Sequence, residues 1–210
     1  AAPHAVLAGE LALPAHARGL VLFAPGGGSR RGARERSIAA ALQRRGIGTL
    51  LVDLSTVDEG HDPVARGDVP RLAQRLQAAL AWAGDVGAPG LPVGLFGSGT
   101  GAAAALIVAA AHPREVAAVA TAGARVEGVD EDVLAQVRTP VLLLVGGEDD
   151  SVLACNRQAQ AGMARWASLE VVEGATHRFE EPGALARVAE AAGYWFAAQF
   201  GSRREGAARR

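Results

Sequence analysis

The sequence predicts an α/β fold, in which a mostly parallel β-sheet carries helices on both faces. Short runs rich in β-forming residues alternate with longer stretches of helical periodicity along the chain. Several of the short runs are apolar at nearly every position, as expected for strands buried on both faces. A length of 210 residues suits one domain with a substantial core better than two. We therefore predict a single domain over residues 1–200.

Seven of the short runs have the length and composition of strands. They contain few charged residues, so the sheet they form is expected to lie inside the molecule. In chain order, the predicted strands are residues 6–13, 20–24, 48–54, 93–96, 116–121, 141–145 and 169–172.

Five longer stretches are predicted to be helices. In the second of them, Val69, Leu72, Leu76 and Leu80 fall three or four residues apart and form one core-facing stripe. The third is rich in alanine, and its small side chains allow it to pack close to the sheet. In chain order, the predicted helices are residues 34–45, 69–83, 100–111, 151–164 and 184–200.

The remaining segments are predicted to be loops and a tail. Residues 57–68 are polar and contain glycine, which favours a surface loop. Residues 122–139 are too few for a separate cap domain, although 130–137 could form a short helix. We therefore expect a shallow pocket, or one covered only by loops. The small, polar and basic tail at 201–210 is predicted to be disordered.

Composition excludes several classes of function. Every basic residue is arginine and none is lysine, which removes Schiff-base chemistry and lysine-dependent phosphate loops. The formal net charge of −1 leaves no basic excess for nucleic acid. Cys155 is the single cysteine and cannot form an internal disulfide. The apolar stretches are too short to span a membrane, and no signal-peptide pattern is present, so we expect a cytoplasmic protein.

The most informative segment is the glycine-rich turn after the predicted strand at 93–96. The sequence GSGTG at 97–101 leads into the alanine-rich helix, the strand–turn–helix arrangement on which hydrolases hold a nucleophile in a GxSxG motif. Gly99 stands at the central position of this elbow, where a serine or cysteine is expected. The glycines of this turn also allow the following helix to pack closely against the sheet.

Polar and glycine-rich residues follow three other predicted strands. PGGGSR follows the strand at 20–24, GGEDD follows that at 141–145, and GATH follows that at 169–172. Ligands of open parallel sheets bind at the carboxyl ends of the strands, so these loops are expected to meet around a pocket. The chain order of elbow, acid and histidine is that of an α/β hydrolase.

Three stretches carry a resemblance to a known family: GLFGSGTGAAAAL, VLLLVGGEDDSVLACNRQA and EGATHRFEEPGAL. Residues 19–200 resemble the small, capless α/β hydrolases close to dienelactone hydrolase, some of which are fused to phosphoribosyltransferase-like domains. The resemblance implies an α/β-hydrolase fold without a large cap. It also implies a small ester, lactone or other acyl compound as the substrate.

By position, the resemblance implies roles for individual residues. Asp149 matches the acid of the family's catalytic triad, His177 matches the general base, and Gly99 matches the nucleophile. Asp150, one residue further on, is the alternative acid, and the family match selects Asp149. The loop PGGGSR also departs from relatives, in which it often begins with His and Gly.

The absence of a side chain at Gly99 changes the expected chemistry. In an intact triad, a carboxylate orients the imidazole, which takes the proton of the nucleophile. Gly99 offers no hydroxyl or thiol, so no acyl-enzyme can form on it. Ser98 is the neighbouring hydroxyl, but the alternation of side chains along an extended segment directs it away from His177. The backbone N–H groups of Thr100, Gly26 and Gly27 remain candidates to bind a carbonyl oxygen or an anion.

Two classes of function remain open. The first is an enzyme in which His177 and Asp149 activate water or move a proton on a small acyl compound. The alternative is a catalytically inactive pocket protein that binds a small carbonyl or anionic ligand, or serves in a larger assembly. Gly99 could also be an introduced change in an active enzyme, although the altered PGGGSR loop favours natural divergence.

We expect neither a cofactor nor a metal. GSGTGA fits a dinucleotide fingerprint, but residues 121–123 lack the acid that should follow at the end of the next strand. The histidines other than His177 have no metal-ligand spacing. An apolar edge strand or helix could support a homodimer.

Overall fold

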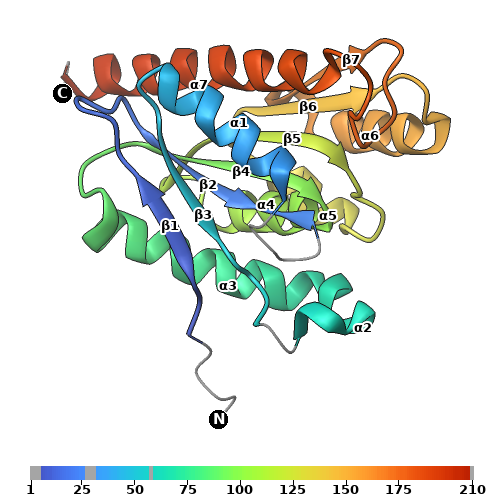
Figure 1. Ribbon diagram of the computed structural model, residues 1–210, viewed down its shortest axis with the longest axis horizontal. Helices are drawn as coiled ribbons and strands as arrows, with labels where there is room; N and C mark the ends of the chain where they lie inside the picture. The colour runs from blue at the N-terminus through green and yellow to red at the C-terminus, as the bar shows by residue number, and fades with distance from the viewer. Residues whose placement is uncertain (1–5, 27–31, 57–58, 209–210) are drawn as a thin grey trace.

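A seven-stranded sheet forms the centre of the molecule (Figure 1). The computed structural model describes residues 6–26, 32–56 and 59–208. The strand order is β1-β3-β2-β4-β5-β6-β7; β1 pairs antiparallel with β3, and the other neighbours pair parallel. The strands are β1 (Gly9–Ala12), β2 (Leu20–Ala24), β3 (Gly48–Val52), β4 (Val93–Gly99), β5 (Val116–Ala124), β6 (Val141–Gly146) and β7 (Ala167–Val172).

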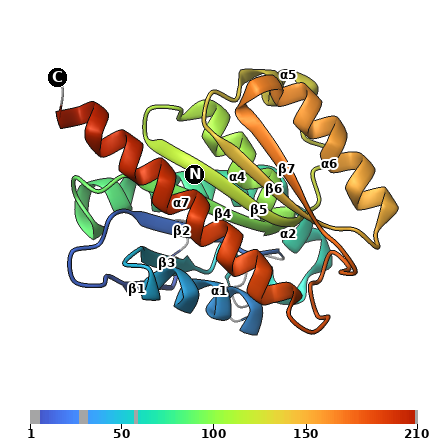
Figure 2. The same ribbon diagram turned by 90° about the horizontal axis from the view of Figure 1, so that it is seen from above.

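Helices cover both faces of this sheet (Figures 1 and 2). One face packs against α1 (Ala33–Arg44) and α7 (Ala184–Ala208). The opposite face packs against α3 (Val69–Trp82), α4 (Thr100–Ala111), α5 (Glu131–Gln136) and α6 (Asp150–Met163). The predicted mostly parallel sheet with helices on both faces is confirmed, and no large cap covers it within the described part of the chain.

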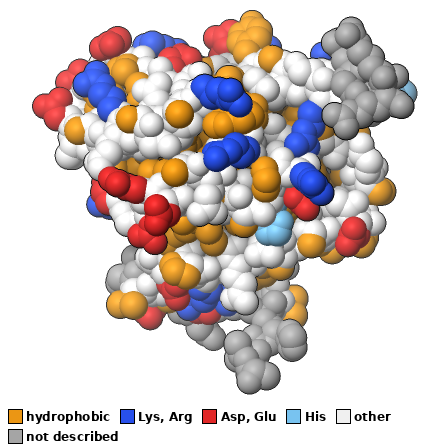
Figure 3. Space-filling view, turned by 180° about the vertical axis from the view of Figure 1, so that it is seen from behind, with side chains coloured by type: hydrophobic (Ala, Val, Ile, Leu, Met, Phe, Trp, Pro, Cys, Tyr) orange, Lys and Arg blue, Asp and Glu red, His pale blue; other side chains and the backbone are white. Residues whose placement is uncertain are grey.

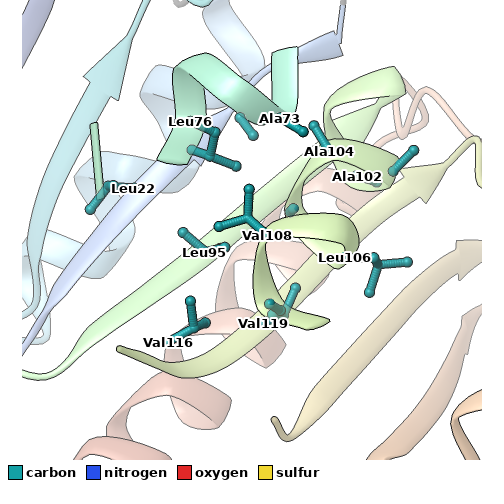
Figure 4. Packing of buried hydrophobic residues seen from close by; sticks show 14 of the residues in the cluster. Leu22, Ala73, Leu76, Leu95, Ala102, Ala104, Leu106, Val108, Val116 and Val119 are labelled. Carbon is teal, nitrogen blue, oxygen red and sulfur yellow. The ribbon is translucent and has the colours of Figure 1, made fainter. Parts of the chain in front are cut away.

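Small side chains bring α4 close to the sheet. Its alanines at 102–105 are all buried, and so are Leu106, Val108 and Ala109. Figure 4 shows Val108 of α4, Leu76 of α3 and Leu95 of β4 together in the layer between helices and sheet. The core on this face is therefore built from small and aliphatic residues, whereas the buried phenylalanines lie on the face covered by α1 and α7.

Two glycines of the GSGTG turn are required by the close approach of α4. A Cβ on Gly97 would lie 2.5 Å from Ala102 Cα, and a Cβ on Gly101 would lie 2.0 Å from the carbonyl oxygen of Ala24. Both separations are far below van der Waals contact. The start of α4 therefore packs directly against the ends of β2 and β4, which fixes the position of the elbow.

Some local predictions differ from the structure. The first strand extends only over Gly9–Ala12. The expected surface loop at 57–68 contains a short 3₁₀ turn (Glu59–His61) and α2 (Pro63–Gly67). The side chain of Asp62 accepts a hydrogen bond from the N–H of Val64 at 2.9 Å, and proline follows Asp62 at the first helical position. This is a favourable helix start.

The end of the chain also differs from expectation. We predicted disorder from residue 201, whereas α7 continues to Ala208. The guanidinium of Arg203 donates to the carbonyl oxygens of Arg114 at 2.9 Å and Pro113 at 3.2 Å, which ties the last turns of α7 to the start of β5. Residues 209–210 lie outside the described residues.

The surface carries both signs of charge. On the face seen in Figure 3, basic and acidic side chains are interspersed among apolar ones. No helix among the described residues is both long enough and apolar enough to cross a membrane.

The close contact at Gly101 generates a stability prediction. Gly101→Ala is expected to destabilise the protein by about 3 kcal/mol, because the added methyl group collides with a backbone carbonyl that cannot move freely. Gly84→Ala is the matched control, since nothing lies within 4 Å of its Cβ position. We expect this control to be neutral or stabilising by about 0.5 kcal/mol. Urea denaturation measures the free energy of unfolding of both variants, and equal values would contradict the proposed packing at Gly101.

Candidate active site

A cleft of about 1120 Å³ opens at the carboxyl ends of the parallel strands. Its walls come from Gly26 after β2, the segment 32–37 at the start of α1, the elbow at 99–100, the end of β5, and the segment 177–185 after β7. Gly26, the elbow and His177, from three of the predicted loops, therefore meet at one edge of the sheet. Residues 146–150 after β6 do not line the cleft themselves, and residues 27–31 of the loop after β2 lie outside the described residues.

Asp149 and His177 lie side by side in this region. Nδ1 of His177 is 2.8 Å from Oδ2 of Asp149. The backbone N–H of His177 donates to the same carboxylate oxygen. These two hydrogen bonds hold the pKa of Asp149 below its ordinary value. The bond from the backbone N–H has the larger effect, and the bond from the ring has the smaller one. With the proton on Nδ1, the lone pair of Nε2 is free to act as a base.

The histidine loop rests on two glycines of neighbouring strands. A Cβ on Gly123, which has a φ of +56°, would lie 2.2 Å from the carbonyl oxygen of His177. A Cβ on Gly146 would lie 2.4 Å from the carbonyl oxygens of Ala175 and Thr176. Only glycine fits at these places, so the ends of β5 and β6 support His177 directly through backbone contacts.

Gly99 has the backbone conformation of an elbow. Its φ is +51° and its ψ is −126°, and it caps the amino end of α4. A Cβ at this position would lie 3.4 Å from Gly26 Cα, an ordinary contact. A side chain would therefore fit here, at a backbone strain of about 1–3 kcal/mol. Glycine adopts the conformation without that strain.

Ser98 lies on the buried side of the elbow. Its side chain is fully buried and donates to Oε1 of Glu35 at 2.9 Å. The N–H of Gly26 donates in turn to Oγ of Ser98 at 3.0 Å. The hydroxyl is thus held by two partners inside the protein, and reaching a substrate would require breaking both hydrogen bonds.

The candidate donors for a carbonyl oxygen differ in their placement. The N–H of Gly26 already binds Ser98, so it could serve a ligand only by sharing or releasing that hydrogen bond. Gly27 lies outside the described residues. Thr100 is the first residue of α4 and lines the cleft, where the positive end of the helix dipole favours negative charge.

Glu35 is the site residue that the sequence analysis missed. It is 5% exposed and lines the cleft from the first turn of α1. Together with Ile38, Ala39 and Leu42 it occupies the buried positions of that helix. An acid at the first position of an i, i+3, i+4, i+7 stripe could have revealed it in the sequence.

Charged side chains line the rim of the cleft. Arg34 pairs with Glu35 at 3.2 Å, and Arg178 pairs with Glu180 at 2.9 Å. Arg125 also lines the cleft, and its backbone N–H donates to the carbonyl oxygen of Gly99 at 3.1 Å. Among the described residues, no three His, Cys, Asp or Glu side chains are grouped as metal ligands would be.

A sequence model of the Dienelactone hydrolase family matches residues 58–200. The chain is 40% identical to a dienelactone hydrolase from Anabaena variabilis, whose crystal structure superposes with a TM-score of 0.88 and a coverage of 94% of both chains. Est1E from Butyrivibrio proteoclasticus shares the fold at 15% identity, with a TM-score of 0.80 over 93% of this chain and 95% of that one.

A longer relative comes from Mycobacterium tuberculosis, where it is named "Putative phosphoribosyl transferase". It is 46% identical over 193 residues, which are 90% of this chain and 43% of the relative. The chain therefore spans less than half the length of this curated relative.

The hydrogen bonds at Asp149 predict how stability depends on pH. Because the pKa of Asp149 is lower in the folded protein than in the unfolded chain, its stabilising effect is complete above the unfolded pKa and is lost as the pH falls through the folded one. Below about pH 4, Asp149→Asn should therefore lose less stability on acidification than the wild type does.

Asp150→Asn is the matched control, since Asp150 is the exposed neighbour. Thermal unfolding between pH 5 and pH 3 measures the effect, with this control expected to follow the wild type. If the melting temperatures of Asp149→Asn and of the wild type fell in parallel with pH, the lowered pKa of Asp149 would be contradicted.

Proposed function

Because this chain belongs to the dienelactone hydrolase family, we propose that it hydrolyses a small ester, lactone or related acyl compound. In this proposal His177 and Asp149 activate a water molecule, which takes the place of the side-chain nucleophile. The observation that supports it is the Asp149–His177 hydrogen bond of 2.8 Å at a cleft whose elbow carries Gly99. In this proposal the pair supplies the base and its orienting acid, and Gly99 supplies no covalent nucleophile.

The proposed reaction proceeds in two steps. Nε2 of His177 takes a proton from water as the water oxygen forms a bond to the carbonyl carbon, which leaves the former carbonyl oxygen negatively charged. The bond to the leaving oxygen then breaks, and the imidazolium returns its proton to that oxygen. Asp149 stays ionised throughout and stabilises the imidazolium, which agrees with its lowered pKa.

The shape of the elbow supports attack by water. Gly99 lacks the hydroxymethyl group of a serine, which is comparable in size to one water molecule. The carbonyl oxygen of the substrate would lie toward Thr100 at the amino end of α4, where the helix dipole favours negative charge. General-base catalysis of this kind contributes roughly 10²–10⁴-fold.

The proposal also covers the cellular location and the binding partners of the protein. We propose a cytoplasmic protein that acts on a small molecule without a metal or cofactor, and not on nucleic acid or at a membrane. Phosphoribosyl transfer, named for the Mycobacterium tuberculosis relative, is not extended to this chain, because more than half of that protein lies outside the match.

The alternative is a pocket protein that binds a carbonyl or anionic ligand without turnover. Two observations favour it. The N–H of Gly26 is occupied by Ser98, which removes one predicted donor for a developing oxyanion. Arg125 presents an exposed guanidinium at the cleft, which suits an anion.

Restoring a nucleophile separates these two functions. The wild type is expected to hydrolyse p-nitrophenyl acetate slowly, without labelling by a fluorophosphonate, and His177→Ala is expected to abolish the hydrolysis. Gly99→Ser should gain fluorophosphonate labelling and a rate increase of about 10²-fold or more, because the base is already in place.

The control variants distinguish hydrolysis from ligand binding without turnover. His177→Ala in the Gly99→Ser background should lose the labelling again, since the serine then has no base. A wild type without hydrolysis, combined with saturable binding of acetate or phosphate that Arg125→Gln abolishes, would support the pocket protein instead. Labelling of the wild type at Ser98 would contradict both.

A further inference from the structure

A buried acid lies beneath the elbow and takes no part in the proposed reaction. Glu35 is 5% exposed, and the hydroxyl of Ser98 donates to its Oε1 at 2.9 Å. The guanidinium of Arg34 donates to the same oxygen through Nε at 3.3 Å and Nη2 at 3.2 Å. A buried carboxylate is costly unless several donors satisfy it. The arrangement is therefore expected to have a use.

The contact with Glu35 sets the direction of the hydroxyl, because the Ser98 O–H donates to Oε1 of Glu35. The lone pairs of Ser98 Oγ are then left for the N–H of Gly26, which donates at 3.0 Å. Glu35, Ser98 and Gly26 thus form one directed chain of hydrogen bonds that links α1, β4 and the loop after β2.

This chain of hydrogen bonds ends at the wall that faces the elbow. Cα of Gly26 would lie 3.4 Å from a Cβ on Gly99, and a Cβ on Gly26 would itself lie 3.1 Å from the carbonyl oxygen of Ser98. The backbone of Gly26 is therefore packed against Gly99 and Ser98 and bounds the space over the elbow on one side.

We propose that Glu35 and Ser98 are a buried positioning pair that holds Gly26 against the elbow and so fixes the wall of the cleft beside Gly99. The use of this wall in the reaction rests on the proposed attack by water. Ser98 then serves as a positioning residue and not as a replacement nucleophile.

Hydrogen exchange at the Gly26 amide tests the pair without any need for turnover. Ser98→Ala and Glu35→Met remove the acceptor of Gly26 and the acceptor of Ser98, respectively, and each should accelerate exchange of the Gly26 amide by about tenfold. Glu35→Gln keeps an oxygen that can accept from Ser98 and should stay within about twofold of the wild type. Ser55→Ala is the matched control, because it removes a buried hydroxyl that has no hydrogen-bond partner among the residues the structure describes.

Coupling between the two residues distinguishes a pair from two separate contacts. If they act as one unit, the double variant Ser98→Ala/Glu35→Met should exchange no faster than either single variant. Unchanged exchange in Ser98→Ala, or effects of the two changes that multiply, would overturn the proposal.

The position of this wall is tested with a single thiol at the elbow. In a Cys155→Ala background, Gly99→Cys is labelled with methyl and with benzyl methanethiosulfonate, and the ratio of the two rates depends on how close the Gly26 wall lies to the thiol. Adding Ser98→Ala should lower the preference for the methyl reagent by about tenfold, whereas adding Ser55→Ala should leave it unchanged. Equal ratios with and without Ser98 would overturn the positioning role, whether or not the protein hydrolyses an ester.

Discussion

Oδ2 of Asp149 holds His177 through two hydrogen bonds, one from the imidazole ring and one from the backbone N–H. A single ring contact would leave the loop free to turn about it, whereas two donors from one residue fix both the position of the chain and the plane of the ring. The lowered pKa of Asp149 follows from the same two bonds. In the proposed reaction, the position, the tautomer and the direction of the His177 ring all depend on this carboxylate.

A second constraint is that backbone segments pack against each other at glycines, where any side chain would collide. Gly101 lies against the end of β2, and Gly123 and Gly146 lie against the loop of His177. Each contact joins segments far apart in the sequence. Gly99 differs from these glycines, since among the described residues only Gly26 lies within 4 Å of its Cβ position. The described contacts therefore leave room for a side chain at the elbow.

The sequence predicted the sheet, the long helices and the Asp149–His177 pair, because buried strands and amphipathic helices have strong local patterns and the site follows the strand ends. The sequence did not predict the hydrogen bond between Ser98 and Glu35. Their hydrogen bond depends on how α1 packs beside β4, which no local pattern encodes, although the place of Glu35 on a buried stripe was a readable signal. The helix at Pro63–Gly67 was missed because polar composition outweighed the helix start at Asp62 and Pro63.

The central claim is that water attacks the substrate directly, with His177 as its base and with no covalent intermediate. Intact-protein mass spectrometry during steady hydrolysis of p-nitrophenyl acetate tests it most directly. The account predicts that the protein keeps its unmodified mass at every time while acetate and p-nitrophenol accumulate. An acetyl adduct that forms and decays at the rate of turnover, on Ser98 or on any other residue, would contradict it.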